Sequence, residues 1–134
     1  MSADASVFLP EALVLHVPEI DCQHQALFAQ LERIKTVCIE ANHLPIACAE
    51  ELLLALQEHF NTEERLALAA GYDFSEHALK HEKMLGAIRQ GIAKVCNGSK
   101  DVFSVLRYIE YWFERHIAEE DKALGVKLLS LIGR

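Results

Sequence analysis

The chain has 134 residues and a formal net charge of −7, from 13 basic and 20 acidic side chains. A chain of this length buries a core as one domain without disulfides. The acidic balance argues against nucleic acid or an anionic membrane surface as a partner, since both repel a negative protein. No apolar run reaches the roughly 18 residues that span a bilayer, and the first residues lack the pattern of a signal peptide. We therefore expect one cytoplasmic domain over residues 1–134.

The four cysteines lie far apart in the sequence and form no CxxC pair: Cys22, Cys38, Cys48 and Cys96. In a cytoplasmic protein this spacing predicts reduced thiols. We interpret each of them as a small buried hydrophobic side chain.

The first predicted helix follows an arm over residues 1–18, which carries Pro10 and Pro18 and shows no sustained period. From Ile20 to about residue 41, apolar residues recur with the spacing of one helical face. Pro45 suits the first turn of the next helix, where its missing N–H costs no bond. Gly71 is placed to end that second helix.

Two further helices and a short terminal one complete the prediction. Ser75 is a candidate cap for the third helix, which ends near residues 97–98, and the fourth opens near Ser99 or Asp101. The last piece, over residues 123–132, is apolar enough to pack as a brief helix. Short loops between long amphipathic helices imply that neighbouring helices run antiparallel. The predicted fold is all-α: an up-down-up-down four-helix bundle over about 19–121, with the N-terminal arm and a C-terminal segment over 122–134.

Each predicted helix carries ionisable side chains on its apolar face. His24, for example, lies four residues after Ile20 and four before Phe28. Burying such groups without partners would cost several kcal/mol each, whereas a bound metal would satisfy all of them. The candidate ligands are His24, His59, Glu63, His77, His81, His116 and Asp121.

The position of these residues along each helix is also informative. They fall near the start of the first and third helices and in the later part of the second and fourth. Because the helices alternate in direction, all seven are predicted to converge at one end of the bundle. The two other histidines, His16 and His43, are expected to lie outside the site, and Glu64, Glu119 and Glu120 to face solvent or the surroundings of the ligands.

Histidine and carboxylate ligands with no cysteine among them suit iron, zinc or manganese. Two six-coordinate ions offer about twelve positions. Five histidines, two bridging carboxylates and a shared oxo or hydroxo group fill all but about one of them. An open position beside a redox-active pair would suit a small diatomic ligand, whereas a structural zinc site would be closed and four-coordinate.

Four segments carry a family resemblance: IDCQH (20–24), HFNTEE (59–64), HALKH (77–81) and HIAEED (116–121), with Trp112 four residues before the last. Over residues 18–122 the sequence resembles the hemerythrins, specifically the bacterial hemerythrin-like proteins. The resemblance implies two irons bridged by oxo or hydroxo and by Glu63 and Asp121. It implies that one iron is held by three histidines and the other by two, and that O2 binds at the second. The members of the two groups would be His77, His81 and His116, and His24 and His59.

Apolar groups would surround this site, including Leu27, Phe60, Trp112 and Phe113. The chain departs from the family's usual pattern in the arm, LVLHVPE before Ile20, and at Asp73, where a proline is common.

Three functions compete. The first is reversible O2 binding for transport, storage or sensing, by a protein that is not an enzyme. The second is a di-iron enzyme acting on peroxide, nitric oxide or ferrous iron. Oxygen-activating di-iron enzymes use more carboxylate ligands, so the five-histidine set favours binding. The third is a purely structural zinc bundle. The sequence identifies no protein partner.

Overall fold

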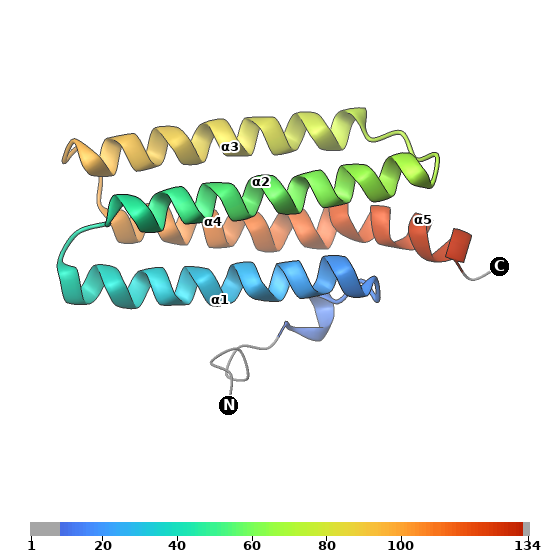
Figure 1. Cartoon of the computed structure of the whole chain (residues 1–134), viewed down its shortest axis with the longest axis horizontal. Helices are drawn as coiled ribbons and strands as arrows, with labels where there is room; N and C mark the ends of the chain where they lie inside the picture. Colours follow the sequence, from blue (N-terminus) through green and yellow to red (C-terminus); the bar gives the residue numbers. More distant parts are fainter. Residues whose placement is uncertain (1–8, 133–134) are drawn as a thin grey trace.

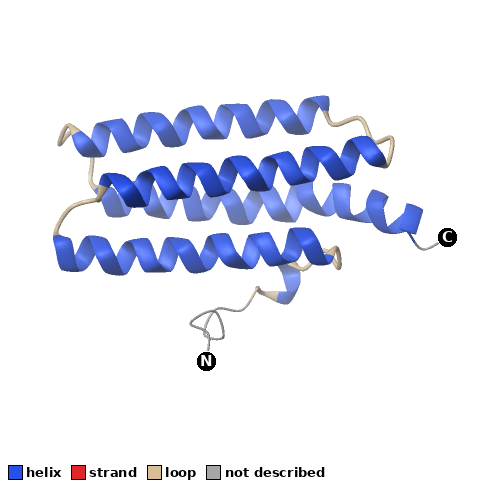
Figure 2. Ribbon diagram, in the orientation of Figure 1, coloured by secondary structure: helices blue, strands red, loops and turns tan. Residues whose placement is uncertain are grey.

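Four long helices lie side by side and alternate in direction (Figure 1). The structure, a computed structural model, describes residues 9–132. The helices are α1 (Pro18–Ala41), α2 (Ile46–Ala69), α3 (Ser75–Cys96) and α4 (Val102–His116). Successive helices contact one another and α4 returns to α1, which closes the bundle. No strand occurs within residues 9–132 (Figure 2). The predicted all-α, up-down-up-down four-helix bundle is confirmed.

The helix ends differ from the prediction in small ways. Pro45 is the residue that precedes α2 rather than part of its first turn. Ser75 is the first residue of α3 and not its cap, a position that Phe74 occupies. The carboxylate of Asp73 accepts the Ser75 N–H at 3.1 Å. Asp101 caps α4, as one of the two predicted positions, and accepts the N–H of Ser104 at 3.1 Å. The aspartate side chains at these places satisfy N–H groups that the helix itself leaves unpaired.

The predicted C-terminal helix is present, but it continues directly from α4 instead of following a loop. After His116 the chain forms a single π-helical segment, η3 (Ile117–Asp121), and then α5 (Lys122–Ile132). The φ and ψ angles at both junctions are helical. Figure 1 shows α4 and α5 as one long element whose last turns extend past the start of α1.

The N-terminal arm packs on the bundle. Residues 9–17 include a single 3₁₀ turn, η2 (Glu11–Leu13), and contact η3. Leu13 and Leu15 are buried there. Residues 1–8 of the predicted arm lie outside the described residues.

The interior of the bundle away from the polar cluster is apolar. It is filled by side chains from all four helices, among them Leu31, Ile34, Leu52, Leu56, Ile88, Val105 and Ile109. None of the helices described has the length and apolar character needed to cross a membrane.

The cysteine prediction is wrong for two of the four thiols. Cys38 is buried, Cys48 is half-buried, and Cys22 and Cys96 are exposed. All four are free thiols. Exposure follows from helical phase, since only Cys38 continues the buried face of its helix.

Candidate metal centre

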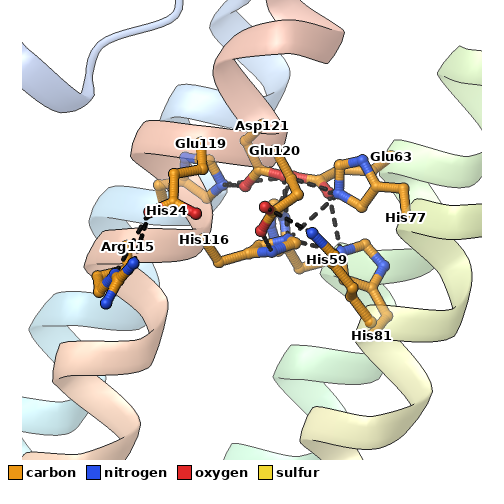
Figure 3. Close-up of polar contacts among 11 residues, drawn as sticks. His24, His59, Glu63, His77, His81, Arg115, His116, Glu119, Glu120 and Asp121 are labelled. Carbon is orange, nitrogen blue, oxygen red and sulfur yellow. Dashed lines mark hydrogen bonds and ion pairs between the residues drawn. The ribbon is translucent and has the colours of Figure 1, made fainter.

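The seven candidate ligands meet inside the bundle (Figure 3). Every one of them is buried, with at most 5% of its surface exposed. α1 supplies one residue, α2 and α3 supply two each, and α4 with η3 supplies two: His24; His59 and Glu63; His77 and His81; His116 and Asp121. The cluster lies nearer the end where α1 and α3 begin, while α2 and α5 extend beyond it.

Two pairs reach the cluster through ordinary helical spacing. His59 and Glu63 on α2, and His77 and His81 on α3, are each four residues apart. Residues at this spacing lie one above the other on the same face of a helix. Each pair therefore presents two ligand atoms to the same part of the interior.

The third pair, His116 and Asp121, is five residues apart. In a regular α-helix that spacing would turn the second side chain roughly 140° away from the first, at about 100° per residue. The π turn of η3 holds one additional residue, which cancels most of this rotation. As a result His116 Nε2 and Asp121 Oδ1 are 3.1 Å apart.

Three imidazoles form one half of the cluster. The Nε2 atom of His116 lies 3.2 Å from that of His77 and 2.9 Å from that of His81. With metal–nitrogen distances of roughly 2.1 Å, neighbouring ligands are about 3.0 Å apart in an octahedral site and about 3.4 Å apart in a tetrahedral one. The observed spacing fits the octahedral site better.

Two imidazoles form the other half. The rings of His24 and His59 meet edge to face, with centroids 4.6 Å apart. The Nε2 atom of His59 is 3.0 Å from Glu63 Oε2, and that of His24 is 3.4 Å from the same oxygen. His24 Nε2 also lies 3.0 Å from Asp121 Oδ2.

Each carboxylate divides its two oxygens between the halves. Glu63 turns Oε2 toward His59, while its Oε1 is 3.3 Å from the Nε2 atom of His77. Asp121 turns Oδ2 toward His24, while its Oδ1 is 2.9 Å from His77 Nε2. Each of the two overlapping groups contains both carboxylates and could hold one metal ion.

Several inward-facing atoms have no hydrogen bond. Despite the short distances, both oxygens of Glu63, both oxygens of Asp121 and the Nε2 atoms of His24 and His59 have no hydrogen-bond partner. Such buried groups are costly when unsatisfied. These atoms lie within 4.8 Å of one another in two groups, and a cation bound in each group would satisfy them. The donor set therefore fits bound metal.

Burial and charge shift the pKa values within the cluster. Burial by itself would lower the pKa of His24 and of His77, but the adjacent Asp121 and Glu63 raise both to about 9. Burial lowers the pKa of His81 to about 4, helped by the neighbouring histidines and opposed by Glu63. Burial would raise the pKa of Glu63, yet its histidine contacts hold it well below the usual range. The carboxylates therefore remain ionised and attract cations.

Aromatic rings cover the outer faces of the three-histidine half. Each imidazole stacks on one ring: Phe60 on His81 at 3.8 Å between centroids, Phe74 on His77 at 4.4 Å and Trp112 on His116 at 4.5 Å. On the other half, Phe113 is perpendicular to His24 and to His59. These rings reduce water access and restrict the orientation of the imidazoles.

Two of the imidazoles donate their Nδ1 protons to side chains outside the cluster. His116 donates to Glu120 at 2.8 Å, and Glu120 in turn accepts from Lys80 at 2.9 Å. His59 donates to the amide oxygen of Gln23 at 2.7 Å. Sequence reasoning placed Glu120 near the ligands but missed Lys80 and Gln23, whose contacts join helices far apart in the chain.

The remaining sequence-predicted groups lie elsewhere. His16 and His43 are exposed, and the Nδ1 atom of His43 contacts the carbonyl of Ala41. Glu119 forms a surface ion pair with Arg115 at 3.0 Å (Figure 3).

The family model described as the hemerythrin HHE cation-binding domain matches residues 15–128. The chain belongs to the hemerythrin family. The matched range contains all seven buried ligand candidates, so the resemblance expected from the four sequence segments is confirmed. No curated protein and no solved structure gave a match. A buried histidine–carboxylate cluster able to hold metal is thus present in a chain of a cation-binding family.

Proposed function

We propose that this protein is a non-haem di-iron protein that binds O2 reversibly. The iron ligands would be His77, His81 and His116 on one side and His24 and His59 on the other. Glu63, Asp121 and an oxo or hydroxo group would bridge the two ions. The observation that carries the proposal is the division of both carboxylates, each with one oxygen directed at each histidine group.

The unequal number of histidines in the two groups supports binding of the small ligand on the side of His24 and His59. The side with His24 and His59 offers one imidazole fewer than the other. An ion held there would have a position left for O2 or another diatomic molecule. Phe113 faces both of these rings, with centroids 5.3 Å from His24 and 6.0 Å from His59, and is 1% exposed. Its apolar ring excludes water and so slows the irreversible oxidation that water and protons promote.

Bound iron would supply the reversible electron exchange with O2 that side chains alone cannot provide. The chain's own contribution is to hold the ions, to keep the carboxylates ionised and to keep the site dry. Five histidines against two carboxylates favour ligand binding over oxygen activation, so we propose a binding protein and not an enzyme.

The test is optical. The iron-loaded protein is reduced without air, exposed to O2 and then deoxygenated. We expect a visible charge-transfer band that appears with O2 and disappears on its removal, with two irons per chain. The His59→Ala variant should lose the band, whereas His16→Ala, which removes an exposed histidine outside the cluster, should retain it.

Two outcomes would contradict the proposal. Irreversible bleaching with consumption of peroxide, nitric oxide or ferrous iron would identify an enzyme. A colourless protein that retains zinc would identify a structural zinc site.

A further inference from the structure

We propose that Gln23 is a positioning residue that fixes the orientation of His59 through a directed chain of hydrogen bonds. The inference rests on the proposed function, because it concerns the ion on the two-histidine side. The chain begins at a backbone carbonyl of α2 and ends at the imidazole.

The direction of every bond in this chain is determined. The carbonyl of Glu58 can only accept, and it accepts the hydroxyl proton of Thr62 at 3.1 Å. The Thr62 oxygen is then free to accept, and it accepts an N–H of the Gln23 amide at 3.0 Å. This orients the amide oxygen of Gln23 toward His59, where it accepts the Nδ1 proton at 2.7 Å. With the amide reversed, two acceptors would meet at Thr62, whose proton is already donated to Glu58.

The chain has a consequence for the metal side of the ring. With its proton held on Nδ1, the His59 imidazole presents the Nε2 lone pair to the interior, 3.0 Å from Glu63 Oε2. A hydrogen bond to the distal nitrogen commonly sets both the tautomer and the orientation of a histidine ligand. Gln23 and Thr62 together therefore prepare His59 to bind an ion.

Gln23 also lies beside His59 at the protein surface. Both residues line a surface hollow between α1 and α2, together with Leu27 and Ala55. Gln23 is half-buried, while His59 is 1% exposed. Without the amide, water from this hollow would compete for Nδ1 and would not hold the ring in one orientation.

The two sides of the site differ in the charge of this supporting group. His116 donates to the carboxylate of Glu120, which is held by Lys80, whereas His59 donates to a neutral amide. An anionic acceptor increases the basicity of an imidazole ligand more than a neutral one does. We therefore expect the ferric form of the ion at His59 to be less stabilised than that of the ion at His116. We also expect Gln23 to influence the reduction potential of the ion at His59.

The experiment compares Gln23→Leu, Thr62→Val and Gln23→Glu with Gln90→Glu, a matched charge change at an exposed position of α3. Cobalt(II) is titrated into the metal-free full-length proteins against a competing chelator. Gln23→Leu should lower the affinity for one of the two ions by roughly 10- to 100-fold and leave the other unchanged. Thr62→Val should produce a smaller loss at the same ion, and Gln90→Glu none.

The midpoint potential of the iron-loaded proteins supplies the second measurement. Gln23→Glu keeps an acceptor for His59 and should retain both ions, but its negative charge should favour ferric iron. A tenfold gain in that preference corresponds to a potential lower by about 59 mV for one electron. Gln90→Glu should leave the potential unchanged.

Unchanged cobalt affinity in Gln23→Leu, together with an unchanged potential in Gln23→Glu, would overturn the inference. Cobalt binding requires neither iron nor O2, so the two proposals can fail separately. If the native protein shows no reversible O2 band while Gln23→Leu weakens one cobalt site, the proposed function is wrong and the positioning role stands.

Discussion

His116 Nε2 and Asp121 Oδ1 lie 3.1 Å apart in the candidate metal centre although the two residues are five positions apart in a helix. The π turn of η3 makes this contact possible, and the helix continues into α5 without a joint. π turns are rare and frequently occur at functional sites. The backbone irregularity is therefore part of the candidate site, since it supplies the second carboxylate.

Removal of either carboxylate is expected to deplete the iron. Glu63→Ala and Asp121→Ala each remove a group that contacts both histidine sets, so both variants should hold well below two irons per chain. Metal analysis after purification measures this. Glu119→Ala, which removes an exposed carboxylate, is the control and should keep the native iron content. Two irons per chain in both carboxylate variants would refute the bridging assignment.

The single tryptophan should report metal binding. Trp112 stacks on His116, with ring centroids 4.5 Å apart and planes 11° from parallel. A redox-active ion on this imidazole would quench the indole by electron or energy transfer. We expect strong quenching of the Trp112 emission on loading with iron.

Zinc, which has a filled d shell, is the control for this measurement. It should occupy the same imidazole with little loss of emission. Equal emission with and without iron would show that no iron binds at His116.

Without metal, the protein should be most stable near pH 6.5. His24 and His77 have folded-state pKa values of about 9 against 6.5 for the free group, so they stabilise the fold fully below pH 6.5. This contribution is lost as the pH rises through 9. His81 has a pKa of about 4, so below pH 6.5 the unfolded chain takes up a proton that the folded chain does not. Stability should therefore also fall as the pH drops from 6.5 toward 4.

The thermal midpoint of chelator-treated protein, followed across this pH range, tests the expectation. Metal binding needs deprotonated histidines, so the zinc-loaded protein should become more stable with rising pH over the same interval. A midpoint of the metal-free protein that keeps rising through pH 9 would contradict the assigned shifts.

Two glycine substitutions should have opposite effects on stability. A methyl group at Gly86 in α3 would meet nothing within 4 Å, so Gly86→Ala should stabilise the helix by roughly 0.5–1 kcal/mol. At Gly125 in α5 the added carbon would lie 3.0 Å from Leu15 Cδ2 and 3.2 Å from Leu15 Cβ. Gly125→Ala should therefore displace the arm and destabilise the protein by about 1 kcal/mol or more.

Urea unfolding of both variants measures the difference. The N–H of Leu15 is held by the carboxylate of Asp21 at 2.9 Å, which limits how far the arm can yield. Equal stabilisation by both substitutions would show that the arm does not pack against α5.

The bundle and the candidate ligands were predictable because they depend on local periodicity. The His59–Glu63 and His77–His81 pairs lie on the apolar face of their helices whatever the neighbouring helices do. The cysteine prediction rested on residue type instead, and it was wrong for Cys22 and Cys96, which helical phase places at the surface. Local periodicity could not foresee that α4 continues into α5 through a π turn, since five-residue spacing alone does not distinguish a bulge from an end.

The sequence by itself determined that histidines and carboxylates line the inside of four antiparallel helices, because side-chain direction in a helix follows from spacing. Only the tertiary structure decided which oxygen of Glu63 and of Asp121 faces which histidine group. It also decided that Gln23 supports His59 from outside, and that Lys80 holds the carboxylate of Glu120 beside His116. These contacts depend on how helices approach one another in space, and hydrogen-bond partners 36 residues apart leave no periodic signal in the chain.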